Sequence, residues 1–220
     1  MSTTEQGRPD TQEMVIVHRV FRREFRLLPD LVAAVPGGNT TRAAVLAEHC
    51  IDMVTGLHHH HAAEDEFLWP PLLRQAKPHA EVVHRMETQH HDMSTALKQV
   101  EALLPEWAAH ARVAERDELV DALRKVQRIL DEHLAEEEKE ILPLVEQFLT
   151  MEQWAAVGER GKEAISDKRK RLLFLGMILE DATPAEEAHF LSRMPPPVRL
   201  LWRLVGRRQY AAHLSNIRTL

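Results

Sequence analysis

Two segments of this sequence place a histidine and a glutamate four residues apart, and a proline follows ten residues after each histidine. The pairs are His60 with Glu64 and His133 with Glu137. In an α-helix, residues four apart lie on the same face, about 6 Å from each other along the axis. Imidazole nitrogens and carboxylate oxygens are common ligands of first-row transition metals. Each segment therefore predicts a helix that offers one nitrogen ligand and one oxygen ligand to a metal ion.

Six polar residues occupy positions that the helical pattern reserves for the core. In four segments, apolar residues recur at steps of three and four, as they do in amphipathic helices. The polar residues that share these apolar stripes are His18, His60, Glu64, His90, His133 and Glu137. Burying several imidazoles and carboxylates without partners is very unfavourable. Metal ions remove this objection, because the side chains become ligands of the metal.

The four segments predict an all-α fold, since no segment alternates with the period of a strand. They cover about residues 11–28, 40–69, 79–104 and 114–149. Pro29, Pro70 and Pro105 are expected to end the first three helices. Pro143 lies inside the fourth pattern and is expected to kink or break it locally. Four long helices with short connections predict an antiparallel four-helix bundle.

The chain divides into three predicted parts. Residues 1–10 are polar and are expected to be a disordered N-terminus, residues 11–150 form the bundle, and residues 151–220 form a helical C-terminal extension. The bundle therefore contains all six candidate metal ligands, and the extension contains none of them.

Several helices are expected in the extension. Thr150 can cap the first, which runs to about residue 164 and has Gln153 as its capping partner. The second covers about residues 167–181. Thr183 opens the third, with a proline at the first helical position.

The last predicted helix, at residues 198–214, is basic on one side and apolar on the other. Its arginines include Arg199, Arg203 and Arg207, and leucines lie on the opposite side. The apolar side is expected to pack on the bundle, or on a second subunit to give a homo-oligomer. Alternatively, it makes a weak contact with an anionic membrane surface.

The charge of the chain is unevenly distributed. The net charge is −6, but residues 166–220 carry 10 basic and 5 acidic residues, so the remainder is strongly acidic. An acidic body argues against a nucleic-acid partner, because phosphate binding requires a basic face. The single cysteine, Cys50, excludes an internal disulfide framework and a cysteine-based metal site. The sequence has neither the apolar core of a signal peptide nor a long apolar span, which predicts a cytoplasmic protein.

The chain resembles the hemerythrin-like family of His-His-Glu cation-binding proteins over about residues 10–150. The segments that carry the resemblance are His18-Arg-Val-Phe-Arg, His60-His-Ala-Ala-Glu64, His90-His-Asp-Met and His133-Leu-Ala-Glu-Glu137. The resemblance implies a four-helix bundle with two iron ions joined by an oxo or hydroxo bridge. It also implies terminal histidine ligands, which would be His18, His60, His90 and His133. The carboxylates that bridge the irons would be Glu64 and Glu137.

Two departures distinguish this chain from the oxygen-carrying members of the family that it resembles. Those members have a second histidine four residues before the one that matches His90, and here that position is Met86. Met86 is expected to be a core residue, which would leave an open position on each iron. Oxygen carriers also place an aspartate five residues after the histidine that matches His133, where this chain has Glu138. The His-x-x-x-Glu spacing of both pairs is closer to that of the branch that resembles iron-centre repair proteins.

Neighbouring residues leave alternatives open at several positions. His91 is the alternative to His90, and Glu138 could add to the site. His49 lies three helical turns away from the predicted site and is expected to be a core or capping histidine. The remaining histidines of the run, expected to face other helices or solvent or to orient a ligand, are His58, His59 and His61.

The predicted function is that of a non-haem di-iron protein that reacts with hydrogen peroxide, dioxygen or nitric oxide. Its role would be protection against oxidative or nitrosative stress, or iron handling. No catalytic residue is expected beyond the metal centre, and the enzyme activities considered are peroxide decomposition and nitric oxide reduction. The alternatives are a reversible oxygen carrier or a gas or iron sensor, and a helical interaction module that uses its metal only for stability.

Overall fold

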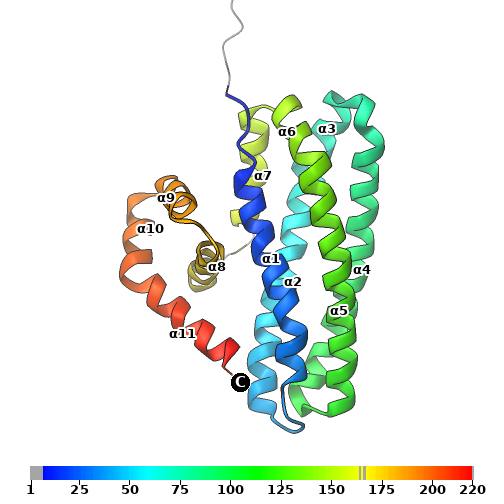
Figure 1. Ribbon diagram of the computed structural model, residues 1–220, viewed down its shortest axis with the longest axis vertical. Coiled ribbons are helices and arrows are strands. Elements are labelled where there is room, and N and C mark those ends of the chain that lie inside the picture. Colours follow the sequence, from blue (N-terminus) through cyan, green and yellow to red (C-terminus); the bar gives the residue numbers. More distant parts are fainter. Residues whose placement is uncertain (1–6, 164, 166, 220) are drawn as a thin grey trace, which may run out of the picture.

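The computed structural model describes residues 7–163, 165 and 167–219, and these residues form helices and no strand. The prediction of an all-α fold is confirmed for this part of the chain. Most of the predicted disordered N-terminus, residues 1–6, lies outside the described residues. Four long helices lie side by side in the bundle of Figure 1. They are α1 (Gln12–Ala33), α2 (Thr40–Phe67), α4 (Ala80–His110) and α5 (Val113–Glu136).

The four long helices close into a ring around a shared core. α1 packs against α2 and α5, and α4 packs against the same two helices. The connections are short, since residues 34–39 join α1 to α2 and two residues separate α4 from α5. Asn39 caps α2 by accepting a hydrogen bond from the amide of Arg42 at 3.1 Å. This ring holds the candidate metal ligands of all four helices at one level.

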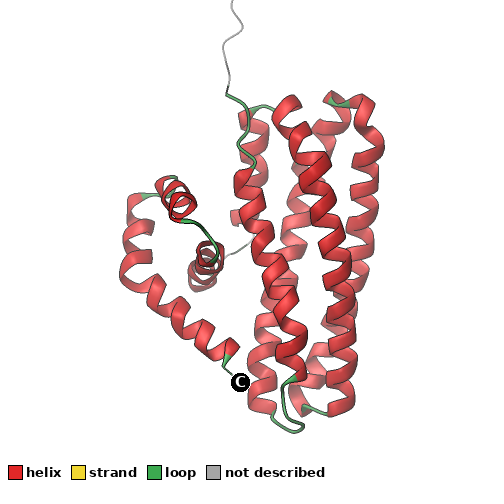
Figure 2. Cartoon of the chain, in the orientation of Figure 1, coloured by secondary structure: helices red, strands yellow, loops and turns green. Residues whose placement is uncertain are grey.

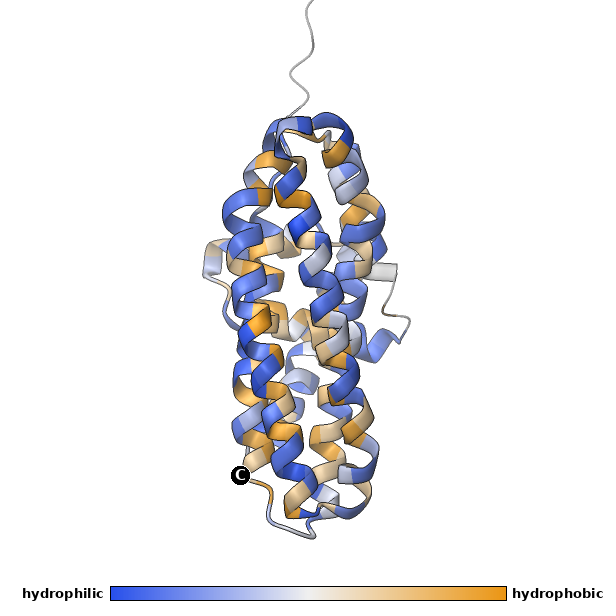
Figure 3. Cartoon of the chain, turned by 90° about the vertical axis from the view of Figure 1, so that its right-hand side faces the viewer, coloured by the Kyte–Doolittle hydropathy of each residue, from blue (hydrophilic) through white to orange (hydrophobic). Residues whose placement is uncertain are grey.

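The core is divided into two apolar clusters that lie on opposite sides of a polar layer. Hydrophobic residues recur along the helices of the bundle in Figure 3. The upper cluster, toward the top of Figure 1, includes Met14, Leu68, Met86 and Ile141. The lower cluster includes Phe21, Leu57, Met93 and Leu130. On each of the four chain segments, the candidate metal ligands fall between a member of the upper cluster and a member of the lower one.

Two prolines lie inside helices, so the predicted limits at residues 28 and 104 are wrong. α1 continues for four residues past Pro29, and α4 continues for five residues past Pro105. A proline inside a helix costs about 3 kcal/mol, because it removes a hydrogen bond and its ring clashes with the preceding turn. Beyond the prolines, Val32 and Trp107 are fully buried, and this apolar burial offsets the cost.

The other prolines mark changes of helix. α2 ends within two residues of the predicted limit, and the short helix α3 (Trp69–Gln75) begins with prolines in its first turn. A 3-10 turn, η1 (Lys77–His79), leads on to α4. The predicted break near Pro143 is confirmed, because the π-helical turn η2 (Glu137–Ile141) separates α5 from α6 (Leu142–Phe148). Such turns are often found at functional sites.

The extension is also helical and lies beside the bundle (Figures 1 and 2). Its elements are α7 (Met151–Glu163), α8 (Lys168–Glu180), α9 (Pro184–Ser192), α10 (Pro196–Leu201), the π-helical turn η3 (Trp202–Gly206) and α11 (Arg207–Arg218). α7 packs on α2, and α8 packs on α1 and α11. The predicted caps are confirmed, since Thr150 and Thr183 each accept a hydrogen bond from the amide three residues on. Residue 164, the predicted end of the first of these helices, lies outside the described residues.

The apolar side of the last predicted helix does not pack on the bundle. Leu200 is 57% exposed and Leu204 is 71% exposed, whereas Trp202 and Tyr210 on the other side are buried. The bundle of the same chain therefore does not cover these leucines, and a second subunit or a membrane surface remains a proposal. Within the described ranges, no helix has both the length and the apolar character needed to cross a membrane.

A partly buried ionic network attaches the extension to the lower half of the bundle. Arg23 of α1 donates hydrogen bonds to Glu24 at 2.8 Å and to Asp181 at 2.6 Å. Arg218 of α11 donates to the same carboxylate of Glu24 at 3.1 Å. His49 of α2 lies 3.1 Å from the other oxygen of Glu24 and is buried, so the prediction of a core histidine is confirmed. The network therefore joins α1, α2, α11 and the end of α8.

The network predicts a pH-dependent contribution of Glu24 to stability. Burial raises the pKa of Glu24, but His49 and Arg23 outweigh it and lower the pKa from 4.5 to about 2. A carboxyl with a depressed pKa in the folded state stabilises the fold above its unfolded pKa, and this stabilisation is lost as the pH falls. We expect Glu24→Gln to lower the free energy of unfolding at pH 7 by about 3 kcal/mol.

The difference between the wild type and Glu24→Gln should close between about pH 4.5 and pH 2. Urea unfolding of the metal-free proteins at several pH values measures it. Asp30→Asn removes an exposed carboxylate from the same helix and serves as the control, with little expected change. An equal loss of stability for Glu24→Gln at pH 7 and at pH 2 would contradict the prediction.

Candidate metal centre

Seven side chains from the four long chain segments meet in the polar layer between the two clusters. They are His18 from α1, His60, His61 and Glu64 from α2, His90 from α4, His133 from α5 and Glu137 from η2. Six of them are buried, and the side chain of His60 is only 10% exposed. All six residues predicted as ligands are thus brought together. Their role as ligands remains a prediction, and His61 joins them as a seventh residue.

The seven residues form two overlapping groups. The first consists of His18, His60, Glu64 and Glu137, and the second consists of His61, Glu64, His90 and His133. Within each group, one nitrogen or oxygen atom from every residue lies within 4.8 Å of the others. Each group therefore offers one metal ion a set of nitrogen and oxygen donors. Glu64 belongs to both groups.

Both carboxylates lie between histidines of the two groups. One oxygen of Glu64 is 3.2 Å from His60 Nε2, and the other is 3.4 Å from His90 Nε2. Glu137 Oε2 lies 3.5 Å from His18 Nε2 and 3.7 Å from His133 Nε2. A carboxylate in such a position can contribute to two metals at once.

The outer nitrogens of three histidines have partners that fix the orientation of the rings. His18 Nδ1 lies 2.9 Å from Glu138, and His90 Nδ1 lies 2.7 Å from Asp65. The third, His133 Nδ1, lies 2.9 Å from the side-chain oxygen of Gln89. An oxygen acceptor at Nδ1 holds the proton there, so that Nε2 presents a lone pair to the centre. Histidines that bind metals usually have such an outer partner.

Burial controls the protonation of this layer. It raises the pKa of Glu64 well above its ordinary value, and the nearby Glu137 carboxylate is the second cause. It lowers the pKa of His133 to about 2, with His90 as the next cause. It also lowers the pKa of His60 well below 6.5. The low pKa values favour the neutral form of the His60 and His133 imidazoles, which is the form that binds a metal.

Several polar atoms of the layer have no hydrogen-bond partner. They are both carboxylate oxygens of Glu64 and of Glu137, and the Nε2 atoms of His61, His90 and His133. Buried polar atoms without partners are unfavourable and uncommon in folded proteins. A cation that prefers nitrogen and oxygen ligands would satisfy all of these atoms together. The donor set therefore fits a metal centre.

The structure separates the alternatives that the sequence left open around the ligands. His91 is exposed and outside both groups, whereas the adjacent His90 belongs to the second group. Glu138 also lies outside the groups, and it contacts the outer nitrogen of His18 while it accepts a hydrogen bond from Arg22 at 2.6 Å. Met86 is fully buried in the upper cluster, in agreement with its expected role as a core residue.

The residue that sequence reasoning missed is His61. Its position next to His60 placed it off the apolar stripe, so no ligand role was predicted for it. The structure nevertheless places it with His90 and His133 in the second group. The expectation that Met86 leaves an open position on each iron stays a prediction, although α2 brings a further imidazole, that of His61, into the layer. The uninterrupted run of four histidines was the only signal in the sequence.

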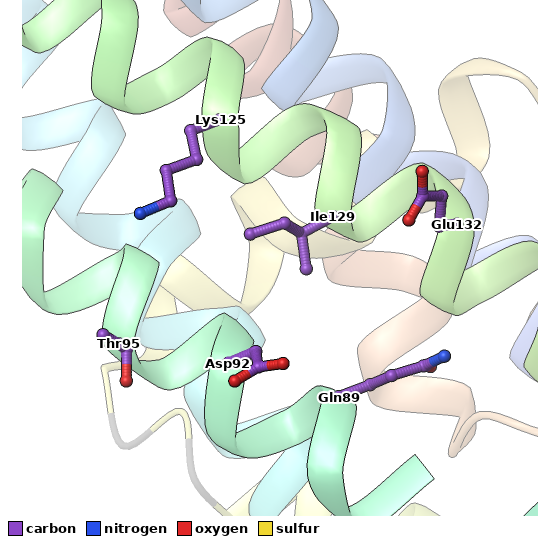
Figure 4. A pocket seen from close by; sticks show the side chains of 6 residues that line it. All are labelled: Gln89, Asp92, Thr95, Lys125, Ile129 and Glu132. Carbon is purple, nitrogen blue, oxygen red and sulfur yellow. The ribbon is translucent and has the colours of Figure 1, made fainter. Parts of the chain in front are cut away.

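Two surface pockets bring solvent close to the layer. One pocket reaches His61 and His90, and its other lining residues are His58, Ala62, Asp65, Glu87, His91 and Ser94. Figure 4 shows a second pocket that is lined by side chains of α4 and α5, among them Gln89. Gln89 also contacts the outer nitrogen of His133. Asp65 and Gln89, the outer partners of His90 and His133, therefore lie at the side of the layer that faces solvent.

A helical bundle with paired histidine and glutamate side chains in its core defines a class of metal-binding helical proteins. Comparison with known families identifies the family within this class. The family described as the hemerythrin HHE cation binding domain matches residues 10–145, and the chain belongs to it. The match covers the helices that supply the seven residues of the layer. Neither the curated proteins nor the solved structures that were searched contain a match to this chain.

The adjacent residues His90 and His91 provide a matched test of the metal centre. We expect His90→Ala to lose most of its metal after dialysis and to unfold at a lower temperature than the wild type when metal is present, because metal binding stabilises the folded state. His91→Ala should keep its metal and its melting temperature. Elemental analysis and thermal melting measure the two effects. Equal metal content in the two variants would contradict the prediction that His90, and not His91, is a metal ligand.

Proposed function

We propose that this protein is a non-haem di-iron protein that reacts with small oxidants, namely hydrogen peroxide, dioxygen or nitric oxide. In this proposal the four long helices form an antiparallel bundle around two irons. The observation that carries the proposal is the position of Glu64 and Glu137, each between histidines of both groups. Carboxylates that lie between two groups of histidines suit a pair of metal ions better than a single metal ion.

Iron suits this donor set better than the other common metals. Imidazole and carboxylate ligands together suit iron, and the high share of imidazole disfavours manganese and magnesium. Zinc prefers a closed tetrahedral site with fewer ligands. His18 and His60 would hold one iron and His90 and His133 the other, with Glu64 and Glu137 shared. When bound, two irons can exchange one electron each with a small molecule.

Burial of the centre supports a small reactant. Glu64, Glu137 and His18 have no exposed surface, and they are enclosed above and below by the two apolar clusters. A large substrate could not reach these atoms without separating the helices. Peroxide, dioxygen and nitric oxide are small enough to reach these atoms while the helices stay packed.

Access of protons favours reactive chemistry over oxygen carriage. Glu138 is 24% exposed and contacts the outer nitrogen of His18, and Asp65 is 52% exposed and contacts that of His90. Burial raises the pKa of Glu138, but its hydrogen bonds with His18 and Arg22 outweigh this and lower it. Glu138 therefore remains an acceptor that holds the proton at His18 Nδ1. The exposed Asp65 instead links His90 to solvent, which supplies the protons that reduction of peroxide or nitric oxide consumes, whereas a reversible carrier benefits from a shielded centre.

The same reasoning supports a finer assignment within the family. Both ligand pairs have the His-x-x-x-Glu spacing, and a buried methionine, Met86, lies one turn before His90. We infer that the chain is closer to the branch that resembles iron-centre repair proteins than to the oxygen carriers. Its role would be stress protection or iron handling in the cytoplasm, with peroxide decomposition or nitric oxide reduction as the activity.

Metal analysis and the reaction with dioxygen test this function. We expect two irons per chain in reconstituted protein. Dioxygen added to the di-ferrous protein should change its absorption in one direction only, so that vacuum does not restore the original spectrum. Peroxide and nitric oxide should also react, and the metal-depleted His90→Ala protein is the control.

Three other outcomes identify the alternatives. An absorption change that vacuum reverses would indicate a carrier or a gas sensor. Insensitivity to all three oxidants would indicate a helical interaction module with a structural metal. A single bound zinc, with no iron after reconstitution, would exclude the di-iron centre altogether.

A further inference from the structure

We propose that His61 is a third histidine ligand of the metal held by His90 and His133. The two metals would then have different sets of protein ligands, with three histidines at one metal and two at the other. This inference rests on the proposed di-iron centre and adds a residue that the pattern of the sequence does not assign to it.

The surroundings of His61 are those of a ligand. Its side chain is 5% exposed, and its Nε2 atom is buried without a hydrogen-bond partner. Its ring stacks on His90, with 4.1 Å between the ring centres and an interplanar angle of 19°. It meets His133 edge-on, with the ring centres 5.1 Å apart. The nitrogen of His61 thus lies with the donor atoms of His90, His133 and Glu64, all within 4.8 Å of one another.

The other histidines of the run show that this placement is specific. His58 is partly exposed, and its Nε2 lies 3.7 Å from Glu101 on α4. His59 is also partly exposed and belongs to neither group. Only His60 and His61 reach the layer, and they turn toward different helices. His60 contacts His18 of α1, whereas His61 contacts the histidines of α4 and α5.

A packing role for His61 accounts less well for these contacts. A buried imidazole that serves only for packing normally has hydrogen-bond partners for its nitrogens. His61 instead has an unpartnered Nε2 atom and belongs to a group in which Glu64, His90 and His133 also have unpartnered atoms. No methionine or leucine at this position could satisfy them, and a metal ion satisfies all four together.

The two groups differ in the ligands that they offer. Three histidines would hold the second metal and two the first, and each group has four residues, with Glu64 common to both. The metal with fewer histidines would be the one beside His18 and His60. The ring of Phe21 lies against His60, with 5.3 Å between the ring centres, and Phe174 of α8 lies behind Phe21 at 6.2 Å. The extension therefore contributes to an apolar wall beside the first group.

A matched pair of variants in the histidine run tests the inference. His61→Gly and His59→Gly carry the same helix penalty, but only the first removes a proposed ligand. Both are reconstituted with iron and challenged with a chelator. We expect one iron of His61→Gly to leave at least about tenfold faster than in the wild type. Free imidazole should slow this loss, because it fits the space of the deleted ring, whereas His59→Gly should match the wild type.

The Mössbauer spectrum of the wild type provides a second measurement that requires no variant. Two irons with three and two histidines should give two distinct signals of equal area. One signal for both irons would overturn the inference, and so would equal iron loss from His61→Gly and His59→Gly. If His61→Gly does not fold in the metal-free state, as judged by circular dichroism, the spectrum alone decides. Wild-type protein that binds fewer than two irons overturns the proposed function together with this inference, whereas two equivalent irons overturn this inference only.

Discussion

The burial of seven titratable side chains in one layer is the constraint on which the rest of this structure depends. Apolar clusters enclose the layer above and below, and solvent comes close to it at the pocket beside His61 and His90. Its carboxylate oxygens and several of its imidazole nitrogens also lack hydrogen-bond partners. Such a layer is a defect in the core unless cations occupy it, and the apolar clusters must stabilise the fold around it. The same enclosure limits the reactants of the centre to small molecules.

Sequence predicted those parts of the centre that depend on a single helix. The spacing of His60 and Glu64 places both on one helical face whatever the helix packs against, and the same holds for His133 and Glu137. His18 and His90 could be predicted from their phase with neighbouring apolar residues. His61 could not, because it lies about 100° around the helix from His60. Whether that second face is buried depends on how α2 sits between α1 and α4, which is a tertiary property.

The predicted ends of two helices were wrong for a related reason. Pro29 and Pro105 were expected to end helices, yet the helices continue because Val32 and Trp107 are buried beyond them. A local rule gives the cost of a proline, whereas the compensating burial comes from residues distant in the sequence. The contact of Arg23 with Asp181 is non-local in the same sense, since 158 residues separate them. The extension could thus be predicted as helical, but its attachment to the bundle could not.

α2 is the helix that joins the two halves of the centre. Consecutive residues on a helix point about 100° apart, so the adjacent histidines His60 and His61 necessarily address different neighbours. Glu64, one turn further on, lies between those two directions and reaches histidines on both sides. In the proposed centre, a single helix would therefore supply a terminal ligand to each metal and a carboxylate shared by both. The extension packs on this same helix through α7, so the segment beyond the family match also helps to hold α2 in place.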